Sequence, residues 1–546
     1  MPTILINGNE LELPAGLRLN AIEAAARAGV EIPRYCYHAG LAVVGSCRMC
    51  LIEIGRRDAA TGKITMEPKL VPGCNTLVTD GMVLVTESVK VQRARAMVEE
   101  GLLLRHPIDC PICDKAGECL LQDYYFRHGQ DARRADLKPF SSRRRDLGDI
   151  TLFVDRCILC TRCVRFTADV SGTRELMVIH RGVHEEIDVA TGFPLHNNLS
   201  GNVVDLCPVG ALADKDFLYQ QRVWFMRPHA GVCTGCAVGC SIWVDENQDH
   251  VYRLRPRVNP QVNKWWMCNE GRYGYHHVHD PRRLTAPHVS PANGTRSVPD
   301  TLSWAGLPAR LKDCLREAGR LAGVISPFLS VEEAYLLCKL LRTLDPQAML
   351  VLGPVPVMGE DEHFPGFVIA AEKCPNRRGV EAILAHFTHR VDTLEQLLPA
   401  LDQDAIRGVW VSGGYKTDWI DAATAERFQR LPLLVVQDLF PSPLMDLATY
   451  QLPAAAFAER DGSYVNRNDR LQTAAWAIRP PWGVRPEGEL FWEMLDGRGL
   501  YDYRSVLDEL AREILYFSAA VTPIPAVGLD LKMNLLAGTE SQNPNA

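Results

Sequence analysis

The sequence predicts a multidomain chain that is α+β in its first half and α/β in its second half. Two observations predict this division. Fifteen of the 18 cysteines lie before residue 270, in close groups separated by short strand and helix patterns. From Ala322 onwards, short apolar runs alternate with helical patterns, which is typical of parallel sheets. With 546 residues, each half is long enough to bury a core of its own.

The composition is that of an ordinary soluble protein, with 47% apolar and 23% charged residues. A formal charge of -7 argues against nucleic acid as the main partner. The longest apolar runs, such as residues 348–358, are too short and too broken by Pro and Gly to span a bilayer. The start at Met1 has neither the basic nor the apolar region of a secretory signal. We therefore expect contact with a membrane only through partner subunits.

The spacing of the cysteines favours metal binding over disulfides. A secreted disulfide protein of this size would spread its cysteines more evenly, and CxxC pairs in an intracellular chain are more often metal ligands. The densest stretch reads His106-x3-Cys110-x2-Cys113-x5-Cys119, followed by Cys157-x2-Cys160-x2-Cys163. Iron–sulfur clusters need this density, because their irons are held by thiolates and a short loop can wrap one corner of a cluster.

The first group of cysteines lies in an amino-terminal α+β pattern. Residues 3–13 predict a hairpin with a turn at Gly8-Asn9, Ala21–Ala28 a helix ended by Gly29, and Leu51–Ile54 a strand. The cysteines of this group are Cys36, Cys47, Cys50 and Cys74.

Their order is that of plant-type [2Fe–2S] proteins, with a longer first gap. Gly40, Gly45 and Ser46 suit a loop whose amides point at cluster sulfurs. A zinc site is the alternative, and it is less favoured because zinc sites prefer two CxxC pairs.

A histidine precedes the second group. An amphipathic helix is predicted over residues 88–104, and His106 follows it directly. A lone histidine is more often a surface or core residue than a ligand. Here it stands beside three thiols, Cys110, Cys113 and Cys119, which favours the ligand interpretation. A neutral imidazole in place of a thiolate should raise the potential of a cluster, as histidine does in Rieske centres.

A basic segment follows over residues 127–145. Asp131 and Asp136 are outnumbered there by seven basic residues: Arg127, Arg133, Arg134, Lys138, Arg143, Arg144 and Arg145. A solvated linker is the preferred interpretation. The alternative is that these charges compensate anionic clusters on either side.

The third group is a ferredoxin-like triplet with a remote partner. Cys157, Cys160 and Cys163 are completed by Cys207-Pro208, with 43 residues between Cys163 and Cys207. Two strands, 176–180 and 185–189, are predicted between them with a turn at Gly182, and a helix is predicted from Gly210.

The fourth group closes the count of ligands. Strands over 241–244 and 251–255 predict a hairpin between its third and fourth cysteines. Its members are Cys233, Cys236, Cys240 and Cys268. With His106, the fifteen cysteines before residue 270 make sixteen ligands, which is four clusters of four with none left over.

At this point the chain resembles a known family, the large iron–sulfur (G) subunits of bacterial NADH:quinone oxidoreductase, respiratory complex I. The resemblance covers residues 1–285 and is carried by motifs around the ligands: Asp109-Cys110-Pro111, Gly117-Glu118-Cys119, Cys157 to Arg165 and Asp205 to Leu212. It continues more weakly in Leu434-Val-Val-Gln-Asp438, Leu452-Pro-Ala-Ala-Ala456 and Glu459-Arg-Asp-Gly-Ser-Tyr-Val-Asn466.

The resemblance implies a domain for each cluster and a body without one. We expect a β-grasp [2Fe–2S] ferredoxin-like domain at 1–87, a [4Fe–4S] domain with one histidine and three cysteine ligands at 88–140, and a [4Fe–4S] ferredoxin-like domain at 141–225. A [4Fe–4S] domain of molybdopterin-oxidoreductase type follows at 226–285. A degenerate molybdopterin-oxidoreductase-like α/β body is expected at 286–480, and an extended carboxyl-terminal segment at 481–546.

The resemblance also implies a function. Electrons from an NADH/FMN-binding subunit and its [2Fe–2S] partner would enter one [2Fe–2S] cluster, pass two of the three [4Fe–4S] clusters and leave through a two-cluster ferredoxin-like subunit towards quinone. The complex as a whole would couple this flow to proton translocation. The chain would have no catalytic centre and would be peripheral, on the cytoplasmic side of the bacterial inner membrane, with other peripheral-arm subunits as partners.

One departure from molybdenum relatives is informative. They carry Cys-x-Lys-Gly-Arg at the last ligand, whereas this chain has Cys268-Asn-Glu270-Gly-Arg272. Glutamate repels an electron and cannot replace the cation, and only 278 residues follow Cys268. We therefore expect no molybdopterin, and a fourth cluster that is structural and off the electron path.

Two other functions are weighed against this one. The first is a catalytic molybdenum enzyme such as an NAD-linked formate dehydrogenase. The second is an iron–sulfur subunit of a soluble NAD-linked hydrogenase or formate dehydrogenase complex with the same amino-terminal modules, which the sequence discriminates poorly.

The second half predicts strands at 323–325, 349–352, 408–411 and 433–436, with helices at 330–343 and 418–429. Gly413-Gly414 is weak evidence for a nucleotide site, since no G-x-G-x-x-G follows. Cys314 and Cys338 are expected in the core on helices, and Cys374 as a free thiol. Residues 480–495 are expected to be extended, and the tail from Gly538 disordered.

Overall fold

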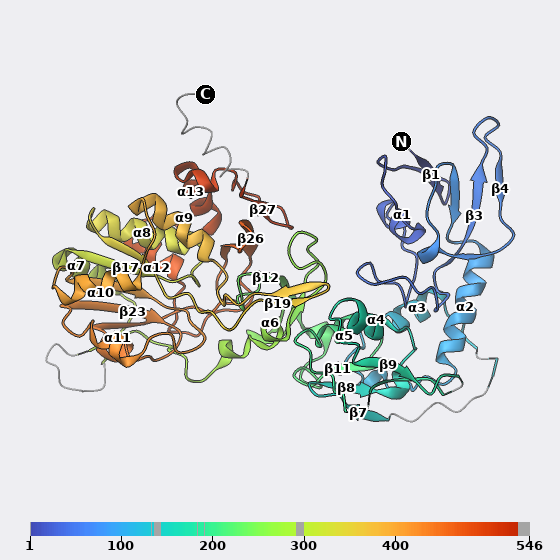
Figure 1. Ribbon diagram of the computed structural model, residues 1–546, viewed down its shortest axis with the longest axis horizontal. Coiled ribbons are helices and arrows are strands. Elements are labelled where there is room, and N and C mark those ends of the chain that lie inside the picture. Colours follow the sequence, from blue (N-terminus) through green and yellow to red (C-terminus); the bar gives the residue numbers. More distant parts are fainter. Residues whose placement is uncertain are drawn as a thin grey trace. The chain divides into compact units, whose positions relative to one another are not determined.

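The computed structural model describes residues 2–132, 134–135, 143–182, 184–190, 192–290 and 300–532. The chain divides into two compact units (Figure 1). The first comprises Met1–Met226 and Phe364–Phe367, and the second Arg227–His363 and Val368–Ala546. Across these described ranges, no helix has the length and apolar composition needed to cross a membrane.

The first unit begins with a mixed sheet. Its strands are β1 (Thr3–Ile6), β2 (Asn9–Glu12), β3 (Leu51–Arg57), β4 (Ile64–Met66), β5 (Val71–Pro72) and β6 (Met82–Val85). The order is β2-β1-β6-β3-β4, β5 pairs with β3, and only the β1–β6 pairing is parallel. The expected hairpin is confirmed, but its turn is Asn7-Gly8, one residue early, because both residues adopt the positive φ of such turns (50° and 87°).

A short helix, α1 (Ala21–Arg27), packs on this sheet. It begins where Asn20 accepts a hydrogen bond from the Glu23 amide (3.0 Å) and Glu23 accepts one from the Asn20 amide (2.9 Å). Its buried face is apolar and shares one core with the strands. This sheet and helix form the expected β-grasp-like domain.

The rest of the first unit carries two further groups of ligands. Its elements are α2 (Val89–Leu103), α3 (Leu120–His128), β7 (Arg144–Asp146), β8 (Ile150–Phe153), α4 (Arg162–Asp169), β9 (Leu176–Ile179), β10 (Glu186–Val189), α5 (Asn202–Leu206) and β11 (Leu212–Asp214). The predicted helix at 88–104 and the β9–β10 hairpin are confirmed. The predicted helix from Gly210 is wrong. Residues 212–214 form β11 because they pair with β8, Leu212 opposite Leu152, and the helix here, α5, precedes Cys207.

The second unit begins with a three-stranded antiparallel sheet of β12 (Arg227–Val232), β13 (Ser241–Asn247) and β14 (His250–Pro256), followed by α6 (Asn269–Tyr273). The predicted hairpin is β13–β14. Sequence reasoning missed β12, since Pro228 and Gly231 both weaken a strand pattern.

An eight-stranded sheet forms the body of the second unit, in the order β16-β15-β24-β23-β22-β17-β18-β21. Its strands are β15 (His288–Val289), β16 (Asp300–Thr301), β17 (Leu321–Ile325), β18 (Met349–Leu352), β21 (Asp392–Thr393), β22 (Gly408–Ser412), β23 (Leu433–Asp438) and β24 (Tyr450–Pro453). All pairings from β24 to β21 are parallel, which confirms the α/β prediction, whereas β15 pairs antiparallel with both β24 and β16.

Helices cover both faces of this sheet (Figure 1). One core contains residues of α7 (Leu307–Ala318), α8 (Val331–Leu344), α9 (Arg377–Thr388), α12 (Glu487–Met494) and α13 (Tyr503–Glu513). The other contains residues of α10 (Leu394–Asp402) and α11 (Ala422–Glu426). Successive strand residues alternate between the two cores, as Val324 and Ile325 do.

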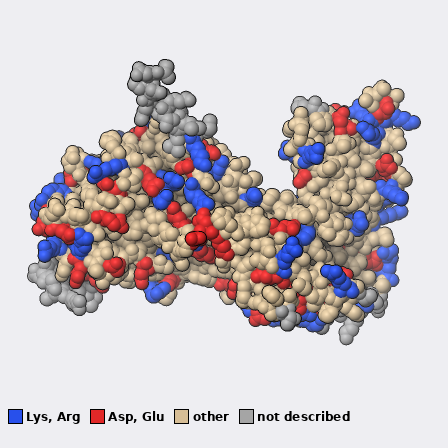
Figure 2. Space-filling model, in the orientation of Figure 1, with Lys and Arg blue, Asp and Glu red and all other residues tan. Residues whose placement is uncertain are grey.

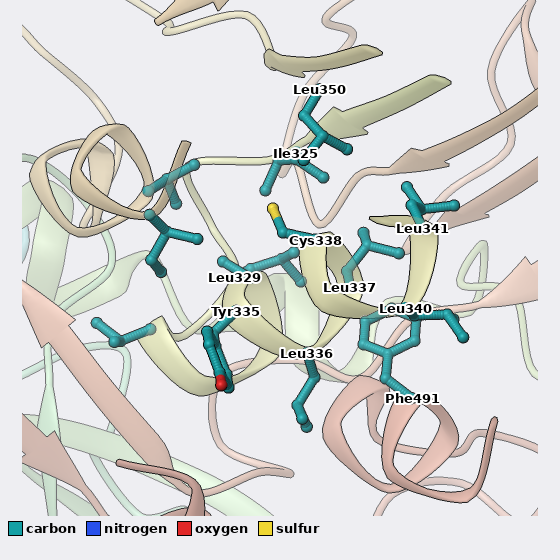
Figure 3. Close-up of a cluster of buried hydrophobic side chains, with 14 of the residues drawn as sticks. Ile325, Leu329, Tyr335, Leu336, Leu337, Cys338, Leu340, Leu341, Leu350 and Phe491 are labelled. Atoms are coloured by element: carbon teal, nitrogen blue, oxygen red, sulfur yellow. The ribbon is translucent and has the colours of Figure 1, made fainter. Parts of the chain in front are cut away.

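Two helices of the body start at side-chain caps. Ser330 and Glu333 cap each other's backbone amides at the start of α8. Asp421 accepts from the Thr424 amide (2.7 Å), so α11 begins at residue 422 and is shorter than the predicted 418–429. The cysteines predicted for the core lie there: Cys338 points its sulfur towards Ile325 (Figure 3), and Cys314 on α7 packs against the same core.

The prediction of an extended segment at 480–495 is wrong. Residues 487–494 form α12, because Leu490, Phe491 and Met494 share one face and bury it in the core, where the Phe491 ring meets that of Trp410 edge-on at 5.5 Å. Likewise α13 lies within 481–546. The remaining strands are β19 (Glu362–Phe364), β20 (Phe367–Ile369), β25 (Gly462–Val465), β26 (Arg470–Ala474) and β27 (Leu529–Asp530). The tail predicted to be disordered from Gly538 lies outside the described residues.

Charged side chains of both signs are interspersed on the visible face of each unit (Figure 2). In the basic segment, four of the described arginines pair with carboxylates: Arg127 with Glu31, Arg134 with Glu100, Arg143 with Asp155, and Arg145 with Asp188. This pairing agrees with the linker interpretation. Arg133, Asp136 and Lys138 lie outside the described residues.

Candidate metal centres

The fold brings the four cysteines of the first group into contact. Cys36 lies in the loop after α1, Cys47 and Cys50 in the loop before β3, and Cys74 in the turn after β5. The Cys36 thiol hydrogen-bonds with those of Cys47 and Cys74, which lowers its pKa well below the usual range. Hydrogen bonds with the Cys36 and Cys50 thiols raise the pKa of Cys74. Four converging thiols, of which one is readily ionised, suit a metal cluster.

Backbone amides reach these sulfurs in part as predicted. The Cys36 amide donates to the Cys47 sulfur at 3.5 Å, and the Ser46 amide donates to the Cys36 sulfur and lowers the pKa of that thiol. The Gly40 amide does not: it donates to Nδ1 of His38 at 3.1 Å. Gly45 adopts a φ of 62°, which glycine tolerates better than other residues, and so supports the tight turn.

The second group lines one small cavity of about 20 Å³. All four predicted ligands, His106, Cys110, Cys113 and Cys119, contribute to its wall. Burial, and then the charge of Arg156, lowers the pKa of His106 to about 4. The imidazole is therefore neutral at pH 7, which is the form that binds metal.

Arg156 stands between this cavity and the next group of ligands. Its guanidinium donates to Oδ2 of Asp109 from Nε (3.1 Å) and Nη2 (3.0 Å) and lies 4.0 Å from the ring centre of Phe153. Asp109 precedes the ligand Cys110, and Arg156 precedes the ligand Cys157. One partly buried ion pair thus links the second group to the third.

The third group lines a cavity of the same size, about 20 Å³, with Cys157, Cys160, Cys163 and Cys207 in its wall. The chain winds tightly here: Leu159 and Thr161 have φ angles of 52° and 57°, which non-glycine residues rarely adopt. Strained backbone of this kind clusters at functional sites. Burial raises the pKa of Cys160 to about 11.

The fourth group lies in the second unit, and all four of its thiols are buried: Cys233, Cys236, Cys240 and Cys268. The Gly235 amide donates to the Cys233 sulfur (3.4 Å) and the Gly271 amide to the Cys268 sulfur (3.3 Å). A β-carbon at Gly271 would lie 2.9 Å from the Cys233 sulfur, so only glycine fits beside this group.

A lysine that sequence reasoning missed pairs with Glu270 beside the fourth group. Nζ of Lys373 lies 2.5 Å from Oε2 of Glu270. Burial lowers the pKa of Lys416, while the nearby Cys233 and Glu270 raise it. We therefore correct the view that Glu270 leaves this site without a cation. No local spacing signals it, because Lys373 is 103 residues from Glu270.

In the described part of the chain, no three His, Cys, Asp or Glu side chains converge tightly enough to hold a single metal ion. The ligands of an iron–sulfur cluster are shared among several irons and so stand further apart. The chemistry of the four donor sets fits such clusters.

The glycine pair after β22 packs against the chain itself. The Gly414 amide and Nε1 of Trp419 both donate to the carboxylate of Asp438, each at 2.8 Å. A β-carbon at Gly413 would lie 2.2 Å from Cγ of this aspartate. The pair therefore accommodates Asp438, and the nucleotide interpretation gains no support. Cys374 is buried, its sulfur 3.7 Å from Oε1 of Glu372.

Family models match five stretches of the chain. The 2Fe-2S iron-sulfur cluster binding domain matches residues 1–89, and the NADH-ubiquinone oxidoreductase-G iron-sulfur binding region matches 95–134. The ferredoxin-like domain of NADH-quinone oxidoreductase subunit 3 matches 149–213. The molybdopterin oxidoreductase Fe4S4 domain matches 226–280, and molybdopterin oxidoreductase matches 391–496. The chain thus contains domains that bind 2Fe–2S and 4Fe–4S clusters.

Whole-protein comparisons point the same way. The chain is 36% identical to the NADH-quinone oxidoreductase G subunit of Rickettsia felis over 342 residues, 62% of this chain and 48% of the relative. The chain is a homologue of this G subunit. It is also 33% identical to the NADH-ubiquinone oxidoreductase 75 kDa subunit of Reclinomonas americana over 359 residues, 66% of this chain and 50% of the relative.

As a G-subunit homologue, the chain spans about half the length of the curated relatives it matches. Among solved structures, one chain of an NAD+-reducing [NiFe]-hydrogenase in the H2-reduced state is 28% identical, with a TM-score of 0.33. That match covers 41% of this chain and 91% of the hydrogenase chain.

Proposed function

We propose that the chain is an electron-transfer subunit of an NADH:quinone oxidoreductase, with no catalytic centre of its own. The observation that supports this proposal is that sixteen candidate ligand residues lie in four groups of four, of which the second and the third each line a small cavity. When bound, iron–sulfur clusters at these groups would take up and release single electrons.

The assignment of ligands follows the four groups. The [2Fe–2S] ligands are Cys36, Cys47, Cys50 and Cys74. The [4Fe–4S] ligands are His106, Cys110, Cys113 and Cys119; Cys157, Cys160, Cys163 and Cys207; and Cys233, Cys236, Cys240 and Cys268. One domain holds each group, over 1–87, 88–140, 141–225 and 226–285, and the α/β body (286–480) and carboxyl-terminal segment (481–546) hold none.

The residues around each group tune and protect it. Burial of the fourth group's thiols excludes water, and amides such as those of Ser46 and Gly271 donate to sulfur, which stabilises negative charge there. With a neutral imidazole at His106, the second group has one negative charge fewer among its ligands than the third. The second group is therefore the more readily reduced of the two.

The α/β body binds no molybdopterin in this proposal. Open α/β sheets bind ligands at the carboxyl ends of their strands. In this body, side chains of the chain itself pack at that edge: the Tyr415 and Trp419 rings stack at 4.7 Å, and Phe328 packs edge-on against Tyr415 at 5.0 Å. The fourth group, with Glu270 in place of a lysine, would then be structural and off the electron path.

The partners follow from the relatives. An NADH/FMN-binding subunit with its [2Fe–2S] partner would deliver electrons, and a two-cluster ferredoxin-like subunit would receive them on the way to quinone. Other peripheral-arm subunits would complete the assembly, which couples electron flow to proton translocation at the cytoplasmic side of a bacterial inner membrane. The chain would meet the membrane only through these subunits.

Affinity isolation of the tagged chain from its own cells in mild detergent tests this function. We expect a flavin-containing, NADH-oxidising subunit and membrane-embedded subunits to co-purify, with NADH:quinone reductase activity. Co-purification with a nickel-containing subunit and no membrane subunit would identify a soluble hydrogenase complex. Stoichiometric molybdenum in the isolated chain would identify a molybdenum enzyme.

A further inference from the structure

Helix α4 carries Cys163 of the third group and two arginines that contact the loop of the first group. Nη2 of Arg162 donates to the carbonyl oxygen of Tyr37 at 2.7 Å, and its Nη1 donates to that of Leu206 at 3.2 Å. Tyr37 follows the ligand Cys36, and Leu206 precedes the ligand Cys207. Arg162 is buried, so a single guanidinium ties the backbone beside one ligand to the backbone beside the other.

Arg165, one turn further on, contacts the ligand residues themselves. Its Nη2 donates to the carbonyl oxygen of Cys36 and to that of Cys160, the latter at 3.3 Å. Its Nη1 donates to the carbonyl oxygen of Ala42, in the loop between Cys36 and Cys47. The link is reinforced from the end of α4, where Oδ2 of Asp169 accepts from the Ala42 amide at 3.4 Å.

We propose that Arg165 couples the first group to the third: it fixes the gap between them and supplies the bonded route by which an electron crosses it. This inference rests on the proposed function, since it presumes clusters at both groups. From Cys36 to Cys160 the route crosses one nitrogen atom and two hydrogen bonds. Transfer moves one electron and leaves the bonds and protons of Arg165 in place.

Two physical effects make this arginine matter. Electronic coupling between two redox centres falls steeply with distance through space and less steeply along bonds. A nitrogen that donates to the backbones of two ligand residues therefore shortens the effective distance between the first and third groups. A fixed positive charge beside both ligands also favours the reduced form of each, as hydrogen bonds and nearby charge do at other metal sites. Arg162 holds the same two loops but reaches neighbours of the ligands, so it is a positioning residue.

Replacement of Arg165 tests the proposal in the intact complex. Arg165→Met removes the donors and the charge, and Arg165→Lys keeps the charge but cannot bridge two carbonyl oxygens as a guanidinium does. Arg174→Met is the matched control, because Arg174 is an exposed arginine just beyond α4. The readouts are iron and acid-labile sulfide, midpoint potentials from low-temperature EPR, and the rate at which the third group is reduced after rapid mixing with NADH.

We expect Arg165→Met to retain its iron, to lower the potentials of both centres, and to slow electron transfer between them by about tenfold or more. Arg165→Lys should restore the potentials but not the rate, and Arg174→Met should match the wild type. A wild-type rate in either Arg165 variant would overturn the proposal. If the Met variant loses iron, the Lys variant decides alone. Absence of iron from both groups in the wild-type chain would instead refute the proposed function.

Discussion

Gly210 leaves room for the sulfur of Cys113: a β-carbon at residue 210 would lie 2.2 Å from that atom. Gly210 follows Cys207-Pro208 of the third group, whereas Cys113 belongs to the second. The Leu120 amide donates to the Pro208 carbonyl at 2.9 Å in the same region. The loops of two candidate centres therefore interlock, and their spacing is built into the backbone.

Gly210→Ala should disrupt the second centre. The new methyl group and the Cys113 sulfur cannot share the same space, so one ligand is displaced and about four irons are lost. Iron analysis and EPR of the purified complex measure this. Gly101→Ala is the control, since Gly101 lies in helix α2 with no atom near its missing β-carbon. Retention of all four EPR signals in Gly210→Ala would contradict the interlocked geometry.

His106→Cys should keep a cluster but lower its midpoint potential. A thiolate replaces a neutral ligand and adds one negative charge to the oxidised and reduced states alike, which penalises reduction. A redox titration followed by EPR measures the shift, with His196→Cys, an exposed histidine, as the control. An unchanged titration would refute the assignment of His106 as a ligand.

Cys236→Ala should spare NADH-to-quinone electron flow but weaken the fold of the second unit. The fourth group would lose a ligand and up to about four irons, and the binding energy of a structural metal site is folding energy. Thermal unfolding and NADH:quinone reductase activity of the intact complex are the paired measurements. Cys314→Ala controls for loss of a thiol outside the four groups. Loss of electron flow in an assembled complex would place the fourth group on the path.

Glu332 should make the second unit less stable as the pH rises. Burial raises the pKa of this carboxyl to about 7. The Ser463 amide donates to its Oε2 (2.9 Å), and no described residue bonds its Oε1. The nearby Arg460 pairs instead with Glu333 (3.0 Å) and Glu487 (3.2 Å). In the unfolded chain this carboxyl releases its proton near pH 4.5. The contribution of Glu332 to the free energy of unfolding is therefore fully present below that pH and is lost as the pH rises to about 7.

The raised pKa of Glu332 costs the second unit about 3 kcal/mol of its free energy of unfolding once the carboxyl is ionised. Glu332→Gln mimics the protonated acid and should remove this part of the pH dependence. Urea unfolding of wild type and variant at about pH 5 and about pH 8, on either side of the shifted pKa, measures it. Equal pH dependence in the two proteins would show that Glu332 is ionised in the folded chain.

Local patterns predict most of the fold. Closely spaced cysteines, the alternating pattern of β13 and β14 and the apolar runs of the parallel strands are all short-range signals, and each lies where the sequence predicts it. The turn at Asn7-Gly8 differs from the prediction by one residue because either Asn-Gly or Gly-Asn can adopt positive φ.

The features that the sequence did not predict depend on contacts between residues remote in sequence. Strand β11 exists because β8 pairs with it, and α12 because its apolar face meets Trp410. Lys373 beside Glu270 and Arg165 beside Cys36 are separated from their partners by 103 and 129 residues. No spacing rule reaches that far, so only the folded chain shows which charges surround each candidate centre.

Iron and acid-labile sulfide analysis of the anaerobically purified chain, with low-temperature EPR, tests the central claim most directly. Four occupied groups predict about fourteen irons per chain and one binuclear and three tetranuclear signals. Zinc in place of iron, or far fewer than about fourteen irons, would contradict the account.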